Sequence, residues 1–166
     1  MITLNICKHL HISCVLECNC NDHAEECKFD ERVFQANKDR GISDSGGVCQ
    51  DCTGNTEGYQ CDSCKTFFYQ DPELALNHPE ICKPCDCEPD GTTDGGECDR
   101  STDEENGEVA GRCHCKTYTG GKRCDHCKNG YWNFTTENPD GCQGMLERYL
   151  VGGTIITTVL ITRDIA

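Results

Sequence analysis

Two stretches of the chain share one pattern: TEGYQCDSCK at residues 56–65 and TGGKRCDHCK at residues 119–128. Each reads T-x-G-x-x-C-D-x-C-K. The glycines at the third position, Gly58 and Gly121, accept a positive φ at little cost, so we expect a tight turn before each cysteine. A pattern of this length that occurs twice indicates an internal repeat.

The cysteines extend this repeat over most of the chain. Of the 18 cysteines, those between residues 18 and 142 fall into two sets of eight, and each set begins with C-x-C and contains C-x8-C-x2-C in its second half. The first set is Cys18, Cys20, Cys27, Cys49, Cys52, Cys61, Cys64 and Cys82; the second is Cys85, Cys87, Cys98, Cys113, Cys115, Cys124, Cys127 and Cys142. Cysteine at recurring spacings indicates a disulfide framework.

The composition favours a fold that is held together by cross-links. Hydrophobic residues make up 36% of the chain, cysteine included, and aromatic residues only 7%. Each repeat has roughly 60 residues, and a core of that size rarely stabilises a fold alone. Disulfides at about 2–4 kcal/mol each would supply stability of the order of a whole domain. They require an oxidising compartment, which predicts a secreted protein.

The charge and the apolar segments exclude several partners. The formal net charge is −14, which disfavours nucleic acid and anionic lipid surfaces. The apolar stretch at residues 154–162 is too short to cross a bilayer as a helix, so we predict no membrane span.

We expect sparse regular structure, because turn-forming residues recur along the chain. The sequence predicts mostly coil with short antiparallel β-ribbons, for example around residues 112–116, and short helices only at 29–35 and 72–77. The aromatic pairs Phe68-Tyr69 and Tyr131-Trp132 are expected to cover the adjacent disulfides.

Together these features resemble laminin-type EGF-like modules. The resemblance rests on the eight-cysteine order, the repeated ten-residue pattern, the aromatic pairs and the C-x2-C-x-C junction, and it covers residues 18–143. The long insertion between Cys27 and Cys49 is similar to the proximal short arm of a laminin beta-type chain. The implied fold class is small and disulfide-rich: tandem laminin-type EGF-like modules of mostly coil with short antiparallel β-ribbons.

The resemblance also implies a cysteine pairing that spacing alone does not choose, since eight cysteines allow many pairings. Within each module the first cysteine joins the third, the second the fourth, the fifth the sixth and the seventh the eighth. The implied disulfides are Cys18–Cys27, Cys20–Cys49, Cys52–Cys61, Cys64–Cys82, Cys85–Cys98, Cys87–Cys113, Cys115–Cys124 and Cys127–Cys142.

On this basis we divide the chain into four segments. Residues 1–17 form an irregular leader, 18–84 and 85–143 the two modules, and 144–166 a non-homologous, disordered tail. Only Lys83-Pro84 separates Cys82, the last cysteine of the first module, from Cys85, the first of the second. We therefore expect stacked modules with restricted bending. The leader is not a convincing signal peptide, and we interpret the chain as lacking the natural N-terminus of its parent.

Two of the cysteine spacings also suit zinc. The pairs Cys61/Cys64 and Cys124/Cys127 have ligand-like C-x2-C spacing, and His114 and His126 lie near the second pair. The first repeat lacks histidines at the aligned positions, so a zinc-binding module is only a remote alternative. We predict no metal, no cofactor and no catalytic residue, because no calcium-loop or nucleophile motif is present.

The resemblance implies a non-enzymatic fragment of an extracellular-matrix glycoprotein in basement membrane. We expect a semi-rigid spacer in a laminin-like short arm, with a role in cell adhesion and matrix assembly. Its partners would be other matrix proteins, including laminin alpha and gamma chains through parts of the parent outside this sequence, and a cell-surface receptor. The alternative is a netrin-like secreted ligand whose modules bind that receptor directly. Asn133-Phe134-Thr135 is an N-glycosylation sequon, which makes Asn133 a glycosylation candidate.

Overall fold

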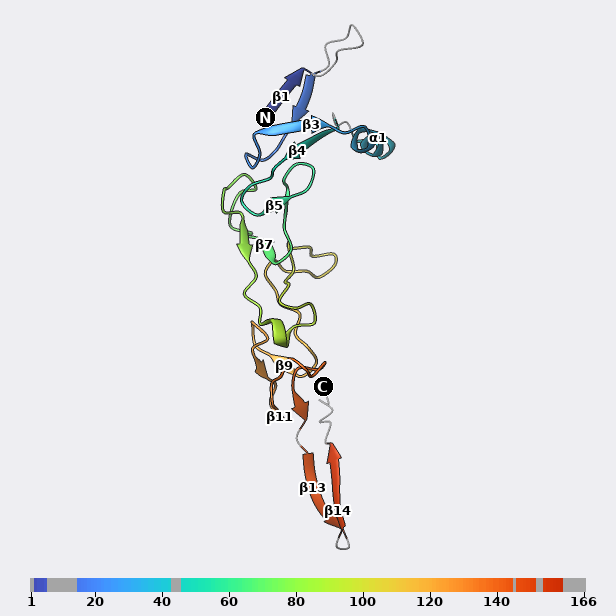
Figure 1. Cartoon of the computed structure of the whole chain (residues 1–166), viewed down its shortest axis with the longest axis vertical. Coiled ribbons are helices and arrows are strands. Elements are labelled where there is room, and N and C mark those ends of the chain that lie inside the picture. Colours follow the sequence, from blue (N-terminus) through green and yellow to red (C-terminus); the bar gives the residue numbers. More distant parts are fainter. Residues whose placement is uncertain (1, 6–14, 43–45, 145, 152–153, 160–166) are drawn as a thin grey trace. The chain divides into compact units, whose positions relative to one another are not determined.

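The structure is a computed structural model that describes residues 2–5, 15–42, 46–144, 146–151 and 154–159 (Figure 1). The chain forms two compact units. Unit 1 extends to Pro84 and also contains Arg100–Gly111; unit 2 contains Cys85–Asp99 and continues from Arg112. This division does not follow the sequence repeats, because residues 100–111 of the second repeat lie in the unit of the first.

Unit 1 is built from antiparallel strand pairs joined by turns. The pairs are β1 (Ile2–Asn5) with β2 (Val15–Cys18), β3 (Glu26–Phe29) with β4 (Gly47–Gln50), β5 (Thr56–Glu57) with β6 (Ser63–Cys64), and β7 (Phe68–Gln70) with β8 (Cys82–Pro84). Register places Cys27 opposite Cys49 in the β3–β4 pair. Sheets this small cannot be stable alone, so the cross-links between them must hold unit 1 together.

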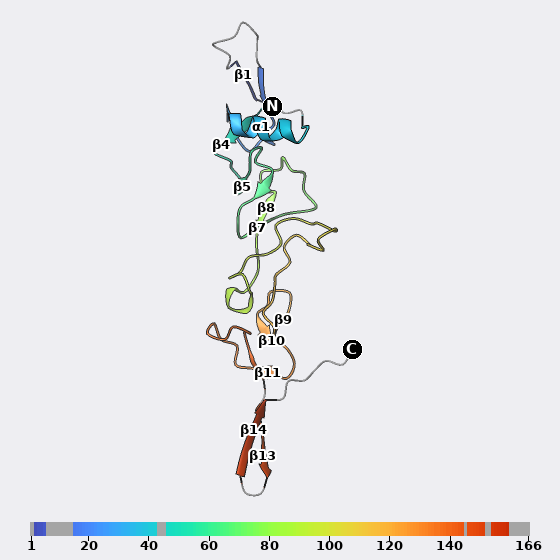
Figure 2. The same ribbon diagram turned by 90° about the vertical axis from the view of Figure 1, so that its right-hand side faces the viewer.

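One helix, α1 (Glu31–Asp39), lies in the insertion between β3 and β4 (Figures 1 and 2). It begins after Asp30, whose carboxylate accepts hydrogen bonds from the backbone N–H groups of Arg32 (2.8 Å) and Val33 (3.2 Å). This N-cap satisfies donors that the first helical turn leaves free. The helix predicted at residues 29–35 therefore exists, but it starts later and runs further than the prediction.

The helix predicted at residues 72–77 is absent. The segment instead makes turns, in which the N–H of Leu74 donates to the carbonyl of Asp71 (3.2 Å) and the N–H of His78 donates to that of Ala75 (2.8 Å). The side chains of Leu74 and Leu76 pack against a buried cluster that contains Ile81. Tertiary packing therefore overrides the weak helical propensity of this short segment.

Unit 2 follows the same plan. Its elements are the 3₁₀ helix η1 (Pro89–Gly91), and the antiparallel pairs β9 (Thr119–Gly120) with β10 (His126–Cys127), β11 (Tyr131–Trp132) with β12 (Gln143–Gly144), and β13 (Leu146–Val151) with β14 (Thr154–Val159). Its strands up to β12 have two residues each, and the strands β13 and β14 after them have six residues each. The ribbon expected near residues 112–116 is present only as isolated bridges, Thr92 to Cys115 and Cys98 to Cys113.

The C-terminal segment differs from its description as a disordered tail. The backbone of β13 pairs with β14 in a register that runs from Leu146 opposite Val159 to Val151 opposite Thr154. Threonine, isoleucine and valine dominate β14, and β-branched residues favour strands.

Cysteine dominates the buried interior. Cys61, Cys124 and Ile81 are completely buried. One cluster of unit 1 consists of Cys18, Cys20, Cys27, Cys49 and Cys61; a second consists of Cys64, Ile81 and Cys82, with Phe68, Leu74 and Leu76 packed against it. The core of unit 1 is therefore made mainly of disulfide sulfur rather than of aliphatic side chains.

The aromatic pairs behave differently in the two repeats. Phe68 packs against the buried cluster of Cys64 and Cys82, as expected. In the second repeat Tyr131 stacks on Tyr118, with ring centroids 4.2 Å apart, while Trp132 is 51% exposed. Trp132 is thus the more exposed member of its pair, and the expectation that it covers a disulfide stays a prediction.

Candidate functional site

Each module contains four disulfides, and every one joins two cysteines of the same eight-cysteine set. They are Cys18–Cys27, Cys20–Cys49, Cys52–Cys61, Cys64–Cys82, Cys85–Cys98, Cys87–Cys113, Cys115–Cys124 and Cys127–Cys142. Their sequence separations range from 9 to 29 residues. Loops of that size correspond to about 3 kcal/mol of stabilisation each in the chain-entropy account.

The glycine turn predicted in each ten-residue pattern is confirmed. Gly58 has φ +96° and Gly121 has φ +87°. The turn closes when the N–H of Cys61 donates to the carbonyl of Gly58, and the N–H of Cys124 donates to that of Gly121, both at 3.3 Å. Both cysteines also have positive φ, +52° and +60°. The same local geometry therefore brings the sixth cysteine of each module back to its partner.

A threonine occupies the first position of each ten-residue pattern, and its contacts explain why. Thr56 and Thr119 are almost completely buried. The hydroxyl of Thr56 donates to the carbonyl of Thr53 (2.7 Å). That of Thr119 donates to the carbonyl of Gly91 (2.7 Å) and lies 3.1 Å from the carbonyl of Lys116. A buried hydroxyl needs such a partner, so the threonine both fills the turn and locks it.

A loop of the second repeat, Arg100–Gly111, is docked on the first repeat within unit 1. We call it the docked loop. The guanidinium Nη1 of Arg100 lies 2.6 Å from a carboxylate oxygen of Glu57 and donates to the carbonyl of Cys64 at 2.9 Å. The backbone carbonyl of Arg100 accepts from the N–H of Gln70 at 2.7 Å. Arg100 therefore links three segments of the first repeat by its side chain and its backbone.

The far end of the docked loop also approaches the first repeat. Gly111 has φ +79°, and a Cβ at this position would lie 3.2 Å from the ring of Tyr69. A larger residue would strain the backbone and push against that ring.

The tip of the docked loop is held by its own carboxylate. Asp103 accepts hydrogen bonds from the backbone N–H groups of Glu105 (3.0 Å) and Asn106 (3.3 Å), and from the side-chain amide of Asn106 (2.7 Å). The amide of Asn106 is the main reason why the pKa of Asp103 lies below its ordinary value. Hydrogen bonds within residues 103–106 therefore hold the tip of the docked loop in a turn.

At the base of the docked loop, within unit 2, Asp99 has a buried carboxyl group. Its side chain is 4% exposed and lies 2.8 Å from the Nη2 of Arg112 and 2.5 Å from the Nε2 of His114. Its N–H donates to the carbonyl of Arg112 at 3.0 Å. A buried carboxylate requires this kind of pairing, so the three side chains join the two chain segments from which the loop departs.

Sequence reasoning did not find Arg100, Glu57 or Asp99. Arg100 and Asp99 lie outside the repeated ten-residue pattern, and Glu57 occupies a variable position of it. Arg100 contacts a carboxylate 43 residues away in the chain. A pairing over that distance has no local signal in a single sequence.

The histidines near the C-x2-C pairs have other partners. His114 lies against Asp99, and the Nδ1 of His126 lies 2.8 Å from a carboxylate oxygen of Asp125. That hydrogen bond is the main cause that holds the pKa of Asp125 below its ordinary value. Among the described residues, no group of three or more histidine, cysteine, aspartate or glutamate side chains is arranged to hold a metal ion.

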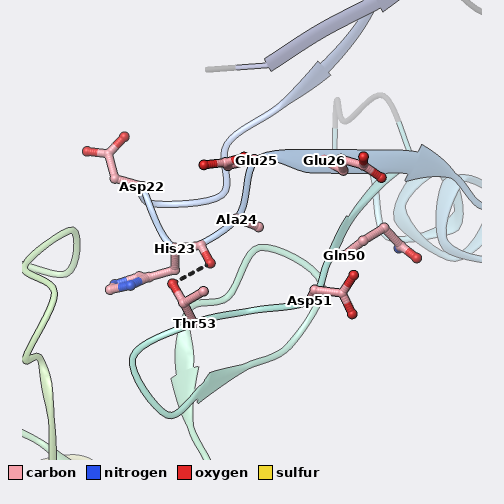
Figure 3. Close-up of a pocket in the computed structure, with 8 residues that line it drawn as sticks. All are labelled: Asp22, His23, Ala24, Glu25, Glu26, Gln50, Asp51 and Thr53. Carbon is pink, nitrogen blue, oxygen red and sulfur yellow. Dashed lines mark hydrogen bonds between the residues drawn. The ribbon is translucent and has the colours of Figure 1, made fainter.

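A surface cavity of about 370 Å³ lies in unit 1 (Figure 3). It is lined by Asp22, His23, Ala24, Glu25, Glu26, Gln50, Asp51 and Thr53. In Figure 3, Asp22 lies on the left and Glu26 and Gln50 lie on the right of the group of lining residues. The Nε2 of buried His23 lies 2.8 Å from the carbonyl of Leu76, and the hydroxyl of Thr53 donates to the carbonyl of His23 at 2.9 Å. The histidine therefore anchors the backbone behind the cavity.

Asn133 and the two cysteines outside the eight-cysteine sets, Cys7 and Cys14, remain to be placed. Asn133 is exposed and follows β11. Cys7 and Cys14 lie outside the described residues. In the described part of the chain, no helix has the length and apolar character needed to cross a membrane.

The chain matches known proteins over both modules. The laminin EGF domain family matches residues 18–82 and 85–142. Laminin subunit beta-1 of Drosophila melanogaster is 50% identical over 127 residues, and laminin subunit beta-1 of Homo sapiens 43% identical over 127 residues; each match covers 76% of this chain and 7% of the relative. Netrin-4 of Homo sapiens is 43% identical over 122 residues, which cover 70% of this chain and 18% of that protein. The chain therefore spans about 7% of the length of the laminin subunits, and with its tandem eight-cysteine modules it belongs to the laminin EGF domain family.

Proposed function

We propose that the chain is a non-enzymatic part of a laminin-like short arm and acts there as a semi-rigid spacer. Its laminin beta relatives are secreted proteins of the basement-membrane matrix, and the disulfides require an oxidising compartment. The observation that carries the spacer role is the docked loop, in which the second repeat reaches back onto the first. A spacer of this kind would hold other parts of the parent chain at a set distance during matrix assembly and cell adhesion.

The docked loop supports stiffness because it adds a second attachment to the covalent junction. The junction alone, Lys83-Pro84, leaves bending and rotation about a few backbone bonds. Arg100 and Glu57 are about half exposed, so their ion pair contributes only about 0–1 kcal/mol. The two hydrogen bonds to the backbone of Cys64 and from Gln70 add about 0.5–1.5 kcal/mol each. A total of about 1–4 kcal/mol would keep the loop docked in most molecules.

Backbone ¹⁵N relaxation of the full chain tests this proposal. We expect both repeats to report one rotational correlation time, and Arg100→Ala to separate the two values. The matched control is Arg123→Ala, because Arg123 is also half exposed and forms an ion pair, at 2.9 Å, with Asp86 of the same repeat. Independent tumbling of the repeats in the unmodified chain, or equal effects of the two substitutions, would refute the spacer role.

The alternative function is that of a netrin-like secreted ligand, and the match to netrin-4 favours it. In that case the modules themselves would bind a cell-surface receptor. Saturable binding of the full chain to cells, lost when its disulfides are reduced, would support this alternative. The spacer proposal predicts no saturable binding, because its contacts with matrix partners, including laminin alpha and gamma chains, would lie in other parts of the parent.

A further inference from the structure

The side chains of one sequon in unit 2 are free to react. Asn133 is exposed, and within residues 46–144 neither its amide nor the hydroxyl of Thr135 takes part in a hydrogen bond. The backbone of Thr135 is nevertheless fixed, since its N–H donates to the carbonyl of Gly141 (3.1 Å) and its carbonyl accepts from the N–H of Asn138 (3.3 Å). The acceptor amide and the hydroxyl that completes the sequon are therefore both available on an ordered turn.

The middle residue of the sequon anchors this turn. The ring of Phe134 lies against Gly91, where its Cε2 would be 3.1 Å from an added Cβ. The sequon thus has an inward-facing aromatic ring between two residues with free polar groups. Phe134 does not obstruct the amide of Asn133, because the ring is directed to the interior of unit 2.

The backbone at Asn133 turns away from the strand. Asn133 has φ +56°, a left-handed conformation that asparagine adopts more readily than most residues. It ends β11 after two residues, whereas the corresponding strand of the first repeat, β7, continues to Gln70. The first repeat has Gln70-Asp71-Pro72 at the aligned positions and no sequon. The feature therefore belongs to the second repeat alone and is not part of the common framework.

An uncovered aromatic ring precedes the sequon directly. Trp132 is 51% exposed, although Tyr131 beside it is stacked on Tyr118. The face of an indole ring carries partial negative charge and attracts the polarised C–H groups of a sugar ring. Trp132 thus exposes apolar surface to water beside the free amide of Asn133. A sugar attached to that amide would cover this surface.

We propose that Asn133 carries an N-linked oligosaccharide whose first sugar packs on Trp132. The co-reactant is an oligosaccharide on a lipid pyrophosphate. The amide Nδ2 of Asn133 forms a bond to the anomeric carbon, the bond from that carbon to the pyrophosphate oxygen breaks, the lipid pyrophosphate leaves, and Nδ2 loses one proton. This modification takes place in the secretory route, so it rests on the secretion that the proposed function also requires.

The modification is tested on the full chain secreted from animal cells. Enzymatic release of the glycan in H₂¹⁸O should mark Asn133 as aspartate in the peptide map. Thr135→Ala should abolish the mark, and Thr135→Ser, which keeps a hydroxyl, should retain it. Secreted, fully disulfide-bonded chain without sugar at Asn133 would refute this inference while leaving the spacer proposal intact.

The packing on Trp132 is tested by acrylamide quenching, because this is the single tryptophan of the chain. Since about half of the indole is exposed, a sugar over its face should lower the quenching constant by about twofold relative to Thr135→Ala. Thr135→Ser should behave like the unmodified chain. Equal quenching of glycosylated and unglycosylated protein would refute the contact.

Discussion

Gly91→Ala should strongly destabilise unit 2, although it adds a single methyl group. The φ of Gly91 lies outside the left-handed region, so alanine meets no backbone penalty there. A Cβ would, however, overlap the carbonyl oxygen of Cys124 and lie 2.9 Å from its carbonyl carbon. Cys124 is completely buried and bonded to Cys115, so its backbone has little room to yield.

The loss of unfolding free energy in Gly91→Ala can be estimated from the groups that the added methyl would displace. Overpacking of a filled interior costs about 1–3 kcal/mol. The carbonyl of Gly91 accepts from the hydroxyl of Thr119 (2.7 Å) and the N–H of Lys116 (2.8 Å), and a shift of the backbone would weaken both bonds. Each is worth about 0.5–1.5 kcal/mol. We therefore expect the free energy of unfolding to fall by about 2–5 kcal/mol, a large part of the stability of a small domain.

Urea unfolding with the disulfides intact, followed by the fluorescence of Trp132, measures this loss in unit 2. The matched control is Gly120→Ala, since Gly120 also lacks a left-handed φ. An added Cβ there would meet the flexible side chain of Lys128 at 3.3 Å and the ring of His126 at 3.9 Å, and no backbone atom. The control should change the free energy of unfolding by less than about 1 kcal/mol. A similar small change for Gly91→Ala would show that the close approach to Cys124 does not shape the fold.

Three further predictions concern the cross-links and two loops. Non-reducing peptide mapping should recover the cysteines of the two modules in eight disulfides, each within one module and including Cys64–Cys82; a bond between modules would contradict the framework. Phe67 has φ +66°, and the aligned residue of the second repeat, Gly130, has φ +85°. Phe67→Gly relieves about 1 kcal/mol of backbone strain, because it removes a side chain from a left-handed conformation. We therefore expect Phe67→Gly to lower the urea midpoint less than Gly130→Ala does. NMR titration should place the pKa of Asp103 below its ordinary value, because Asn106 stabilises the carboxylate. The contribution of this group to stability is present above its unfolded pKa and is lost as the pH falls through the lower folded pKa. A midpoint at or above the ordinary value would show that the loop tip is open in solution.

Local signals in the sequence were sufficient to predict the turns that occur in both repeats. The positive φ at Gly58 and Gly121 follows from the absence of a side chain before a cysteine that must turn back. The helix near residues 29–35 was found but misplaced, because its start is set by the cap at Asp30 rather than by the apolar pattern. The exposure of Trp132 was missed, because a two-residue strand buries only one face and the sequence does not say which.

By itself the sequence determined the compartment, the cross-linked architecture and the repeat, because cysteine spacing and turn residues act over a few positions along the chain. Only the tertiary structure decided that Arg100–Gly111 lies in the unit of the first repeat and that Arg100 pairs with Glu57. Such contacts join segments that are distant in the chain, and their energy comes from burial and geometry that exist only once the disulfides have closed the loops. The proposed spacer role depends on those long-range contacts.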